Sequence, residues 1–451
     1  MAPNVNYSLP ETQPHCPEQG PKLVIAGASR LSGHVHISGS KNSALSILAA
    51  TLCCTGRSKL NNVPNVSDIR AMASILASVG ARVEFSGNQV VVDAGRARST
   101  EPDPALMGEI RGGFFILGPL LARFGEAVVG LPGGCNIGAR PVDIYVSGLR
   151  ALGAYVEVRD TKVVARAANG KNLTGGEFRL DYPSVGATQT LMMAACMATG
   201  TTLLSNVAKE PEIVDLARFL TKAGAHIQGS GTNTIRVYGT NRLQGSEHDI
   251  TPDRIEMGTF MLAAAITRSS ISMSPAADPR SLSCLIDKLS RVGCKIAYEH
   301  NVLKVCAEEL LVGFDLKTEP YPGFPTDLQP QTMALLATCC GSSIVEESVF
   351  ENRMSHVKEL QKLGAKIEVH ESHAFVHGIE ASNKLRGGRV VAGDLRGGAA
   401  LVLAGLAAEG VTEVYGISHI ERGYEDFHKK LQLLGADIKR IDCSKFTNFR
   451  V

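Results

Sequence analysis

The sequence predicts an α/β (α+β) protein of two domains, each an inside-out α/β barrel of three βαβαββ repeats with helices inside and sheets outside. Three observations predict this fold: the length of 451 residues, a short phrase that recurs six times, and a wholly apolar helical stretch in each repeat. A chain of this length exceeds one ordinary core, so two domains are expected.

The recurring phrase joins a helix to a strand through a glycine. An amphipathic stretch such as HVKELQKLGA is followed by an alternating strand such as KIEV. The glycine ends the helix, and we expect it in the left-handed conformation. A period of about 70 residues indicates one structural unit copied six times. The glycines of the phrase are Gly80, Gly153, Gly224, Gly293, Gly364 and Gly435.

A second helix precedes the phrase in each unit and is apolar on all sides. Its sequences are SALSILAATLCC, GGFFILGPLLARF, ATQTLMMAACMA, MGTFMLAAAI, PQTMALLATCC and GAALVLAGLAA. A helix that is apolar all round is buried, so these helices should lie inside and the sheets should face water. Each unit therefore runs strand, buried helix, strand, amphipathic helix, strand, strand.

The repeats divide into two expected domains, with the functional site in the cleft between them. Residues 42–251 form the first domain, and residues 23–41 with 252–451 form the second, after a disordered tail at 1–22. The strand KLVIAGA has no unit of its own and is expected to pair with the second domain. The chain then crosses twice, near Gly39–Asn42 and at a polar, turn-like seam over 245–252.

Composition excludes several classes of partner. The net charge of +2, the absence of Trp and an aromatic content of 5% argue against nucleic acid. The longest apolar run, Ser43–Cys54, is shorter than the roughly 20 residues needed to span a bilayer. None of the eleven cysteines forms a C-x-x-C pair, so no metal site is indicated. We expect a reducing location: the cytoplasm, or the plastid stroma if the source is a plant or alga.

The loop LPGGCNIGARP, residues 131–141, carries the thiol of Cys135 five residues before Arg140. Its glycines and prolines exclude a helix or a central strand. A thiol beside a guanidinium can have a lowered pKa and act as an acid or a nucleophile. The alternative is an inert cysteine in a glycine-rich turn.

The starts of the six buried helices carry polar residues at matching places. Free N–H groups at helix starts attract anions, and Lys41, Arg111 and Arg396 add full charges there. Arg353 and Arg422 follow on loops of the last two units. The alternative for any single arginine is an ordinary surface ion pair. Asp327, in FPTDLQ, is either a helix cap or a general base.

Several motifs together resemble the enolpyruvyl transferases, and among them the family that acts on UDP-N-acetylglucosamine. The resemblance runs from about residue 23 to the end of the chain and is most specific in LPGGCNIGARPVD. It is also carried by GSKNSAL, LGPLLARFG, PSVGAT, EPEIVD, PDRIEMGTF, FPTD, FENRMSHV, DLRGGAALVLAG and HIERGYE. The resemblance implies transfer of enolpyruvyl from phosphoenolpyruvate to the 3′-hydroxyl of the sugar nucleotide, the first committed step of peptidoglycan synthesis. It implies a monomer without cofactor or metal.

The resemblance also implies roles for individual residues. Cys135 would protonate the phosphoenolpyruvate methylene and be alkylated by fosfomycin, and Asp327 would accept the hydroxyl proton, with Lys41 and Arg396 completing the catalytic set. The phosphoenolpyruvate contacts would be Lys41, Asn42, Arg140, Arg353, Arg396 and Arg422. The UDP-N-acetylglucosamine contacts would be Arg111, Arg140, Pro141, Val142, Asp143, Ile144, Ser184, Val185, Gly186, Asp327 and Val349.

Two positions depart from the family pattern, and two other functions stay open. Tyr182 stands where many relatives have a basic residue, and Gln189 stands where GATE is common. The alternatives are a transferase acting on shikimate 3-phosphate, which lacks the cysteine loop, and a paralogue that binds UDP-N-acetylglucosamine without turnover. A scaffold protein would not need cations and Asp327 gathered at helix starts.

Overall fold

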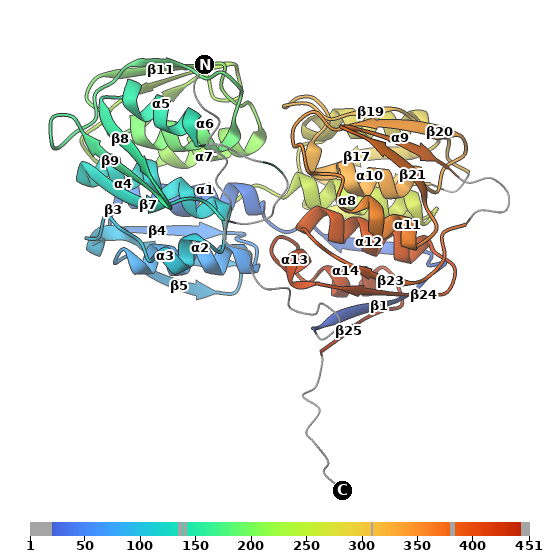
Figure 1. The fold of residues 1–451 in the computed structure, drawn as a ribbon. Coiled ribbons are helices and arrows are strands. Elements are labelled where there is room, and N and C mark those ends of the chain that lie inside the picture. The colour runs from blue at the N-terminus through green and yellow to red at the C-terminus, as the bar shows by residue number, and fades with distance from the viewer. Residues whose placement is uncertain (1–19, 134–137, 139–141, 308–309, 379–383, 443–451) are drawn as a thin grey trace, which may run out of the picture.

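Two separate cores organise the chain. The computed structural model describes residues 20–133, 138, 142–307, 310–378 and 384–442. One buried apolar cluster contains side chains from residues 44–250, and the other contains side chains from 23–37 and 255–438. We call the elements around the first cluster the first lobe and those around the second cluster the second lobe. The two lobes lie side by side in Figure 1.

The helices of the first lobe are α1 (Lys41–Ala50), α2 (Ser67–Ser78), α3 (Pro104–Met107), α4 (Leu117–Phe124), α5 (Asp143–Ala151), α6 (Val185–Ala195) and α7 (Pro211–Lys222). Those of the second lobe are α8 (Arg254–Ile266), α9 (Ser283–Arg291), α10 (Gln329–Leu336), α11 (Val357–Lys362), α12 (Leu395–Ala407), α13 (Ser418–Glu421) and α14 (Phe427–Leu433). Short 3₁₀ turns are η2 (Thr51–Cys53), η3 (Ala94–Arg96), η4 (Arg111–Ile116), η5 (Pro279–Leu282) and η6 (Thr326–Leu328).

The strands of the first lobe are β3 (Cys54–Thr55), β4 (Arg57–Asn61), β5 (Arg82–Ser86), β6 (Gln89–Asp93), β7 (Glu126–Gly130), β8 (Ala154–Arg159), β9 (Lys162–Ala167), β10 (Glu177–Arg179), β11 (Thr201–Ser205), β12 (His226–Gln228), β13 (Thr234–Tyr238), β14 (Leu243–Gln244) and β15 (Glu247–Asp249). Those of the second lobe are β1 (Lys22–Ala26), β2 (Ser32–His36), β16 (Ser270–Ser274), β17 (Lys295–Glu299), β18 (Val302–Cys306), β19 (Leu316–Lys317), β20 (Ser342–Glu346), β21 (Lys366–His370), β22 (His373–His377), β23 (Arg389–Val391), β24 (Val411–Tyr415) and β25 (Ile438–Ile441).

Five four-stranded sheets share one plan, which confirms the repeated unit. Each has one parallel pair at an edge, followed by two antiparallel strands. Their orders are β15-β4-β6-β5, β10-β11-β13-β12, β2-β16-β18-β17, β19-β20-β22-β21 and β23-β24-β1-β25. The remaining unit contributes β7-β9-β8. The sheets lie on the outside of each lobe and the apolar helices, such as α8 and α12, lie within, as the sequence predicts (Figure 1).

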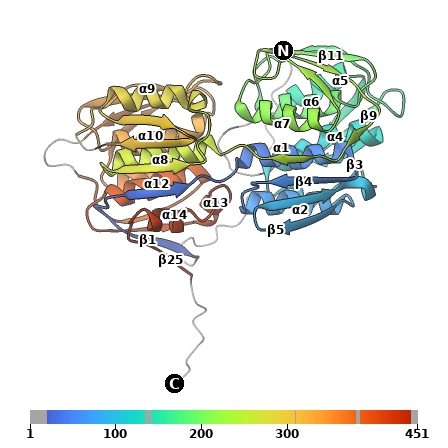
Figure 2. The ribbon, with the colours of Figure 1, turned by 180° about the vertical axis from the view of Figure 1, so that it is seen from behind.

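Some sheets include strands that are distant in the sequence. β1 lies between β24 and β25 in the second lobe, which is where the sequence places the pairing of the first strand; that its partners belong to the last unit was not predicted. β2 pairs with β16, and β15 pairs with β4. Figure 2 shows β1, blue, in the orange and red lobe. The segment 245–252 was expected to be turn-like, but it contains β15, because pairing with β4 supplies its backbone with partners.

All six glycines of the recurring phrase have a positive φ, between 77° at Gly153 and 114° at Gly293. Each follows an amphipathic helix and precedes a strand or an extended segment. A residue with a Cβ is strained in this conformation, so glycine is the residue that ends these helices at low cost. The predicted helix stop is confirmed in every repeat.

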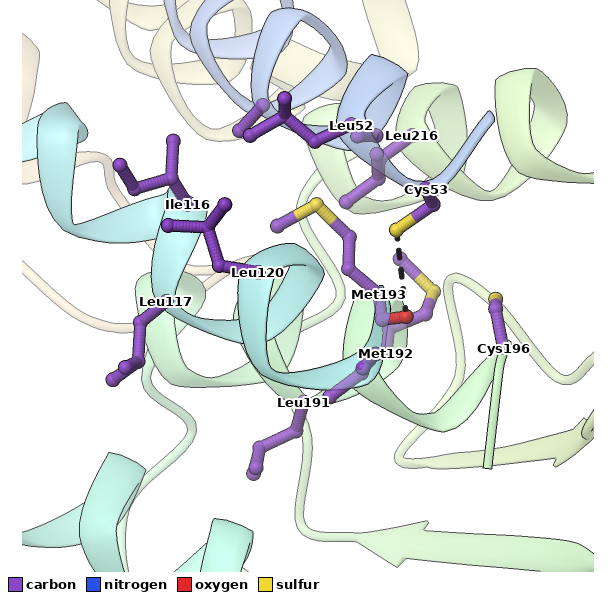
Figure 3. Packing of buried hydrophobic residues seen from close by; sticks show 14 of the residues in the cluster. Leu52, Cys53, Ile116, Leu117, Leu120, Leu191, Met192, Met193, Cys196 and Leu216 are labelled. Atoms are coloured by element: carbon purple, nitrogen blue, oxygen red, sulfur yellow. Dashed lines mark hydrogen bonds between the residues drawn. The ribbon is translucent and has the colours of Figure 1, made fainter. Parts of the chain in front are cut away.

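The apolar helices are buried, as predicted. All residues of α8 are buried, and α4 approaches α6 so closely that a Cβ on Gly118 would lie 2.3 Å from the Thr190 carbonyl oxygen. Figure 3 shows η2, α4, α6 and α7 each contributing side chains to the first core, where the Cys53 thiol lies 3.8 Å from the Met193 carbonyl oxygen. The interior therefore has little free space.

Replacing Leu120 with alanine should destabilise the first lobe. Leu120 is fully buried in the core of α4 and α6, so the substitution loses apolar burial and leaves a cavity. We expect a loss of about 2–5 kcal/mol in the free energy of unfolding. Urea denaturation measures it, with the exposed Leu433→Ala as the control. An equal small loss in both variants would contradict close packing of this core.

Candidate active site

A cavity of about 580 Å³ lies between the lobes, lined by residues of both. It contains most of the predicted site residues that the structure describes, since the starts of α1, η4, α6, η6 and α12 border it. The predicted residues on its wall are Lys41, Asn42, Arg111, Ile144, Ser184, Val185, Gly186, Asp327, Val349, Arg353, Arg396 and Arg422. The helix starts of distant repeats therefore converge on one site.

Some predicted residues do not lie on this wall. Val142 and Asp143 are described but do not line the cavity, and Asp143 is exposed at the start of α5. Cys135, Arg140 and Pro141 lie outside the described residues. The departures Tyr182 and Gln189 both line the cavity, where Tyr182 is exposed and Gln189 is buried.

Asp327 forms the centre of an ion cluster in the second lobe. Its carboxylate is 2.9 Å from Arg353 Nη1 and 3.1 Å from Arg396 Nη2, and both guanidinium groups are buried. Burial of the Asp327 carboxyl favours its neutral form, but Arg396 and Arg353, with Lys41, outweigh this and hold its pKa well below the usual range. Asp327 is therefore ionised at neutral pH. Its side chain makes no capping hydrogen bond to η6, so it is not the plain helix cap that was the alternative.

The start of α12 places Arg396. Asp394 is its N-cap, accepting hydrogen bonds from the backbone N–H groups of Arg396 and Gly397 at 2.9 and 3.0 Å. His356 is buried nearby, and burial is the main reason that its pKa falls to about 4. A neutral His356 adds no positive charge beside Arg353. The positive charges next to Asp327 in this lobe are therefore those of Arg353 and Arg396, which both border the cavity.

Asp68 joins cations from the two lobes. Lys41 Nζ, at the start of α1, is 3.1 Å from its Oδ2, and Arg422 Nε, after α13, donates to its Oδ1 at 2.8 Å. Burial of Asp68 raises its pKa, but the two cations outweigh burial and hold the pKa below the usual value. Sequence reasoning missed Asp68. The only signal is its place in the first turn of α2, where acidic residues are common helix stabilisers.

Replacing Asp68 with asparagine should reduce stability in a pH-dependent way. The pKa of Asp68 is lowered from 3.8, so its ionised form contributes stability above that pH, and the contribution is lost as the pH falls through the lower folded value. We expect the variant to lose about 1–3 kcal/mol at pH 7. Urea midpoints of the two proteins, measured from pH 7 to about pH 2, should differ by a constant amount above about pH 4 and approach each other below it. A difference that does not change with pH would contradict the ionic origin.

The start of α6 presents backbone N–H groups toward the cavity. Ser184 caps the helix, its Oγ accepting from Ala187 N at 3.3 Å, and Val185 and Gly186 begin the first turn. Gly186 lies so close to Tyr145 that an added Cβ would be 2.0 Å from the phenol oxygen. This close-packed helix start has the free donors that suit a phosphate oxygen. Arg111 borders the same cavity, and burial lowers its pKa.

Further charged groups of the cavity wall were not predicted, among them Arg254, Glu212 and Glu210. Arg254, the first residue of α8, donates from Nε to Glu212 Oε1 of α7 at 3.0 Å. Glu210 is mostly buried, and burial is the main cause of its raised pKa. Within the described ranges, no group of three His, Cys, Asp or Glu side chains is placed to hold a metal ion. No helix among them is long and apolar enough to cross a membrane.

Two lobes of repeated units with charged residues gathered between them define the class of protein. Residues 25–431 match the family model described as EPSP synthase (3-phosphoshikimate 1-carboxyvinyltransferase). The chain therefore belongs to this family of enolpyruvyl transferases. It is similar to the solved enolpyruvyl transferase NikO from Streptomyces tendae, with a TM-score of 0.85 and 26% identity over 94% of this chain and all of that one. EPSP synthase from Acinetobacter baumannii, at 17% identity and TM-score 0.73, shares the fold.

Curated relatives are more similar. The UDP-N-acetylglucosamine 1-carboxyvinyltransferase of Gloeobacter violaceus is 50% identical over 441 residues, covering 97% of this chain and 94% of that protein. The enzyme of the same name from Finegoldia magna is 47% identical over 423 residues, covering 93% of this chain and 99% of that protein. The enzyme of the same name from Synechocystis sp. is 47% identical over 421 residues, covering 93% of this chain and 95% of that protein. The similarity thus extends over nearly the whole chain.

Proposed function

We propose that the protein transfers the enolpyruvyl group of phosphoenolpyruvate to the 3′-hydroxyl of UDP-N-acetylglucosamine, releasing phosphate. The observation that carries the proposal is the identity of 47–50% to enzymes named for this reaction, over 93% or more of the chain. The reaction is the first committed step of peptidoglycan synthesis. We place it in the cytoplasm, or in the plastid stroma of a plant or alga, and we propose a monomer of two domains.

The two ion clusters fit a substrate with a carboxylate and a phosphate. Arg353 and Arg396 offer guanidinium groups for the carboxylate, and Lys41 and Arg422 offer charges for the phosphate. Both pairs are already held by a carboxylate, Asp327 or Asp68. Cations fixed in this way stabilise charge in the transition state without reorganisation.

The substrate carboxylate also activates Asp327. Arg353 and Arg396 lower the pKa of Asp327 in the free site. When these guanidinium groups turn to an incoming carboxylate, the negative charge on Asp327 is less compensated and its basicity rises. Asp327 then accepts the proton of the sugar hydroxyl, which requires hydrogen-bond reach to that oxygen.

The reaction proceeds by addition and elimination. The hydroxyl oxygen bonds to C2 of phosphoenolpyruvate, its proton passes to Asp327, and Cys135 donates a proton to C3. In the elimination the Cys135 thiolate takes back a proton from C3 while the bond from C2 to the phosphate oxygen breaks, which restores the double bond in the enolpyruvyl ether. The proton held by Asp327 leaves with the phosphate, so both side chains return to their starting states. Backbone N–H groups at the start of α6, with Arg111, are assigned to the diphosphate of the sugar nucleotide.

Phosphate release tests this function against the alternatives. The purified protein is incubated with phosphoenolpyruvate and either UDP-N-acetylglucosamine or shikimate 3-phosphate, and the product is identified by mass spectrometry. We expect phosphate and an enolpyruvyl ether only with UDP-N-acetylglucosamine. Release only with shikimate 3-phosphate would assign the sister reaction. Binding of UDP-N-acetylglucosamine without release would indicate the non-catalytic paralogue and make Tyr182 and Gln189 the first positions to revert.

A further inference from the structure

The chain passes between the lobes twice, and the two crossings lie side by side. Gly39 forms an antiparallel bridge with Pro252. Ser40 N donates to the Thr251 carbonyl oxygen at 2.8 Å, and Asp253 N donates to the Ser38 carbonyl oxygen at 2.8 Å. We call residues 38–41 with 248–254 the crossing. Lys41 begins α1 at one end of it, and Arg254 begins α8 at the other.

Two buried carboxylates of α7 hold the crossing from the first lobe. Glu212 and Asp215 lie one helical turn apart, and each is 3% exposed. Glu212 accepts from Arg254 Nε at 3.0 Å and from Arg254 Nη2 at 3.4 Å. Asp215 contacts His248 Nε2 at 3.0 Å and accepts from Thr251 N at 3.3 Å. One face of one helix therefore fixes both ends of the segment 248–254.

Asp253 holds the crossing from the second lobe. Its Oδ1 caps α8, accepting from Ile255 N at 2.8 Å and Glu256 N at 3.0 Å. Its Oδ2 accepts from Lys41 N at 3.2 Å. The backbone of Lys41 is therefore attached directly to the first turn of α8.

These contacts connect the two halves of the candidate active site. α7 packs against α1, which carries Lys41. α8 packs against η6, which carries Asp327 just before α10, and against α12, whose first turn carries Arg396. The Glu212–Arg254 pair joins α7 to α8, and both side chains line the cavity. Arg254 Nη1 is buried and has no hydrogen-bond partner among the residues that the structure describes. Burying a guanidinium with one donor unpaired lowers the stability of the fold. Its retention at this point therefore argues that Arg254 has a functional role, which we place in the arrangement of the site.

We propose that Glu212 and Arg254 are positioning residues that fix the crossing and thereby set where Lys41 of the first lobe stands relative to Asp327 and Arg396 of the second. This inference rests on the proposed function for its kinetic consequence, because that reaction needs groups of both lobes at once. The pair acts through the placement of the lobes and not on the reacting atoms.

Two measurements test the pair with Glu212→Gln and the conservative Arg254→Lys. The first is hydrogen–deuterium exchange of peptides spanning 38–42 and 246–256 in the ligand-free protein, where we expect about tenfold faster exchange in Glu212→Gln, as local opening becomes easier. The second is steady-state kinetics. We expect KM for both substrates to rise about tenfold, because a tenfold smaller fraction of the protein holds the two lobes in the arrangement that binds substrate, with kcat little changed. Arg254→Lys keeps the positive charge but loses the two-point hydrogen bonding of the guanidinium. Its exchange rate and its KM values should lie between those of wild type and Glu212→Gln.

The control is Glu126→Gln, which removes an exposed ion pair to Arg166 on β7 and β9 of the same lobe. It should change neither readout. If Glu212→Gln does not fold, the double variant Glu212→Gln/Arg254→Gln removes both charges and avoids a buried unpaired one. That variant should fold and still show fast exchange and the higher KM.

The outcomes are decisive in both directions. Unchanged exchange at the crossing in Glu212→Gln would overturn the proposal, and so would a fall in kcat at constant KM, which would make Arg254 part of the chemistry. Exchange needs no substrate. If wild type itself releases no phosphate with UDP-N-acetylglucosamine, the proposed function fails while the exchange result still decides the role of the pair.

Discussion

The Asp327→Asn protein should lose about 10²–10⁴-fold in kcat, because the amide cannot accept the hydroxyl proton. Asparagine keeps the shape of the side chain and one oxygen acceptor for the two arginines that contact it. Binding of UDP-N-acetylglucosamine should therefore fall much less than turnover. Phosphate release gives kcat, and calorimetry gives the affinity.

The dependence of kcat and kcat/KM on pH gives a second test of Asp327. The pKa of Asp327 is far below the usual range in the free site, so the acidic limb of kcat/KM should not report it near neutral pH. If the substrate carboxylate draws Arg353 and Arg396 away, the acidic limb of kcat should lie at higher pH and vanish in Asp327→Asn. Asp287→Asn, an exposed residue paired with Arg291 on α9, is the control. Equal losses of affinity and turnover in Asp327→Asn would reduce Asp327 to a binding residue.

The Cys135→Ser protein should also lose about 10²–10⁴-fold in kcat, because a serine hydroxyl is far less acidic than a tuned thiol and is a poor donor to carbon. Cys135 lies outside the described residues, so this prediction rests on the loop sequence and the family resemblance. Mass spectrometry after treatment with fosfomycin should show one adduct on wild type and none on the variant.

Cys284→Ser is the matched control, because Cys284 is a half-buried thiol distant in sequence from the loop. It should keep both full turnover and the fosfomycin adduct. A Cys135→Ser protein that turns over at the wild-type rate would remove Cys135 from the mechanism. An adduct that persists in this variant would place the alkylation at another of the cysteines.

The repeated fold could be predicted because each unit carries its own local signals. The glycine after each amphipathic helix needs a positive φ, and the apolar helices need burial, so periodicity alone places both. Residues such as Lys41 and Arg396 could be found because they occupy equivalent helix starts. The same reasoning gave no sign that Asp327 would pair with two arginines instead of capping a helix.

The partners across the lobes could not be predicted. Asp68 meets Arg422 over a separation of 354 residues, and Glu212 meets Arg254 across two different cores. In the sequence these residues look like ordinary acidic and basic residues near helix ends, which are common for reasons unrelated to function. Their roles arise only from the arrangement of the lobes, which no local pattern encodes.

The strand pairing of the second lobe has a consequence for its synthesis. β2 is paired to β16 with a separation of 238 residues between Ser32 and Ser270, and β1 to β24 with a larger one. The ribosome therefore delivers these two strands long before their neighbours, whereas the first core can form from residues 44–250 as soon as they emerge. During that interval the two strands have unpaired backbone groups that are open to wrong partners. A first lobe completed at that stage would keep them attached to a folded body until β16 and β24 arrive.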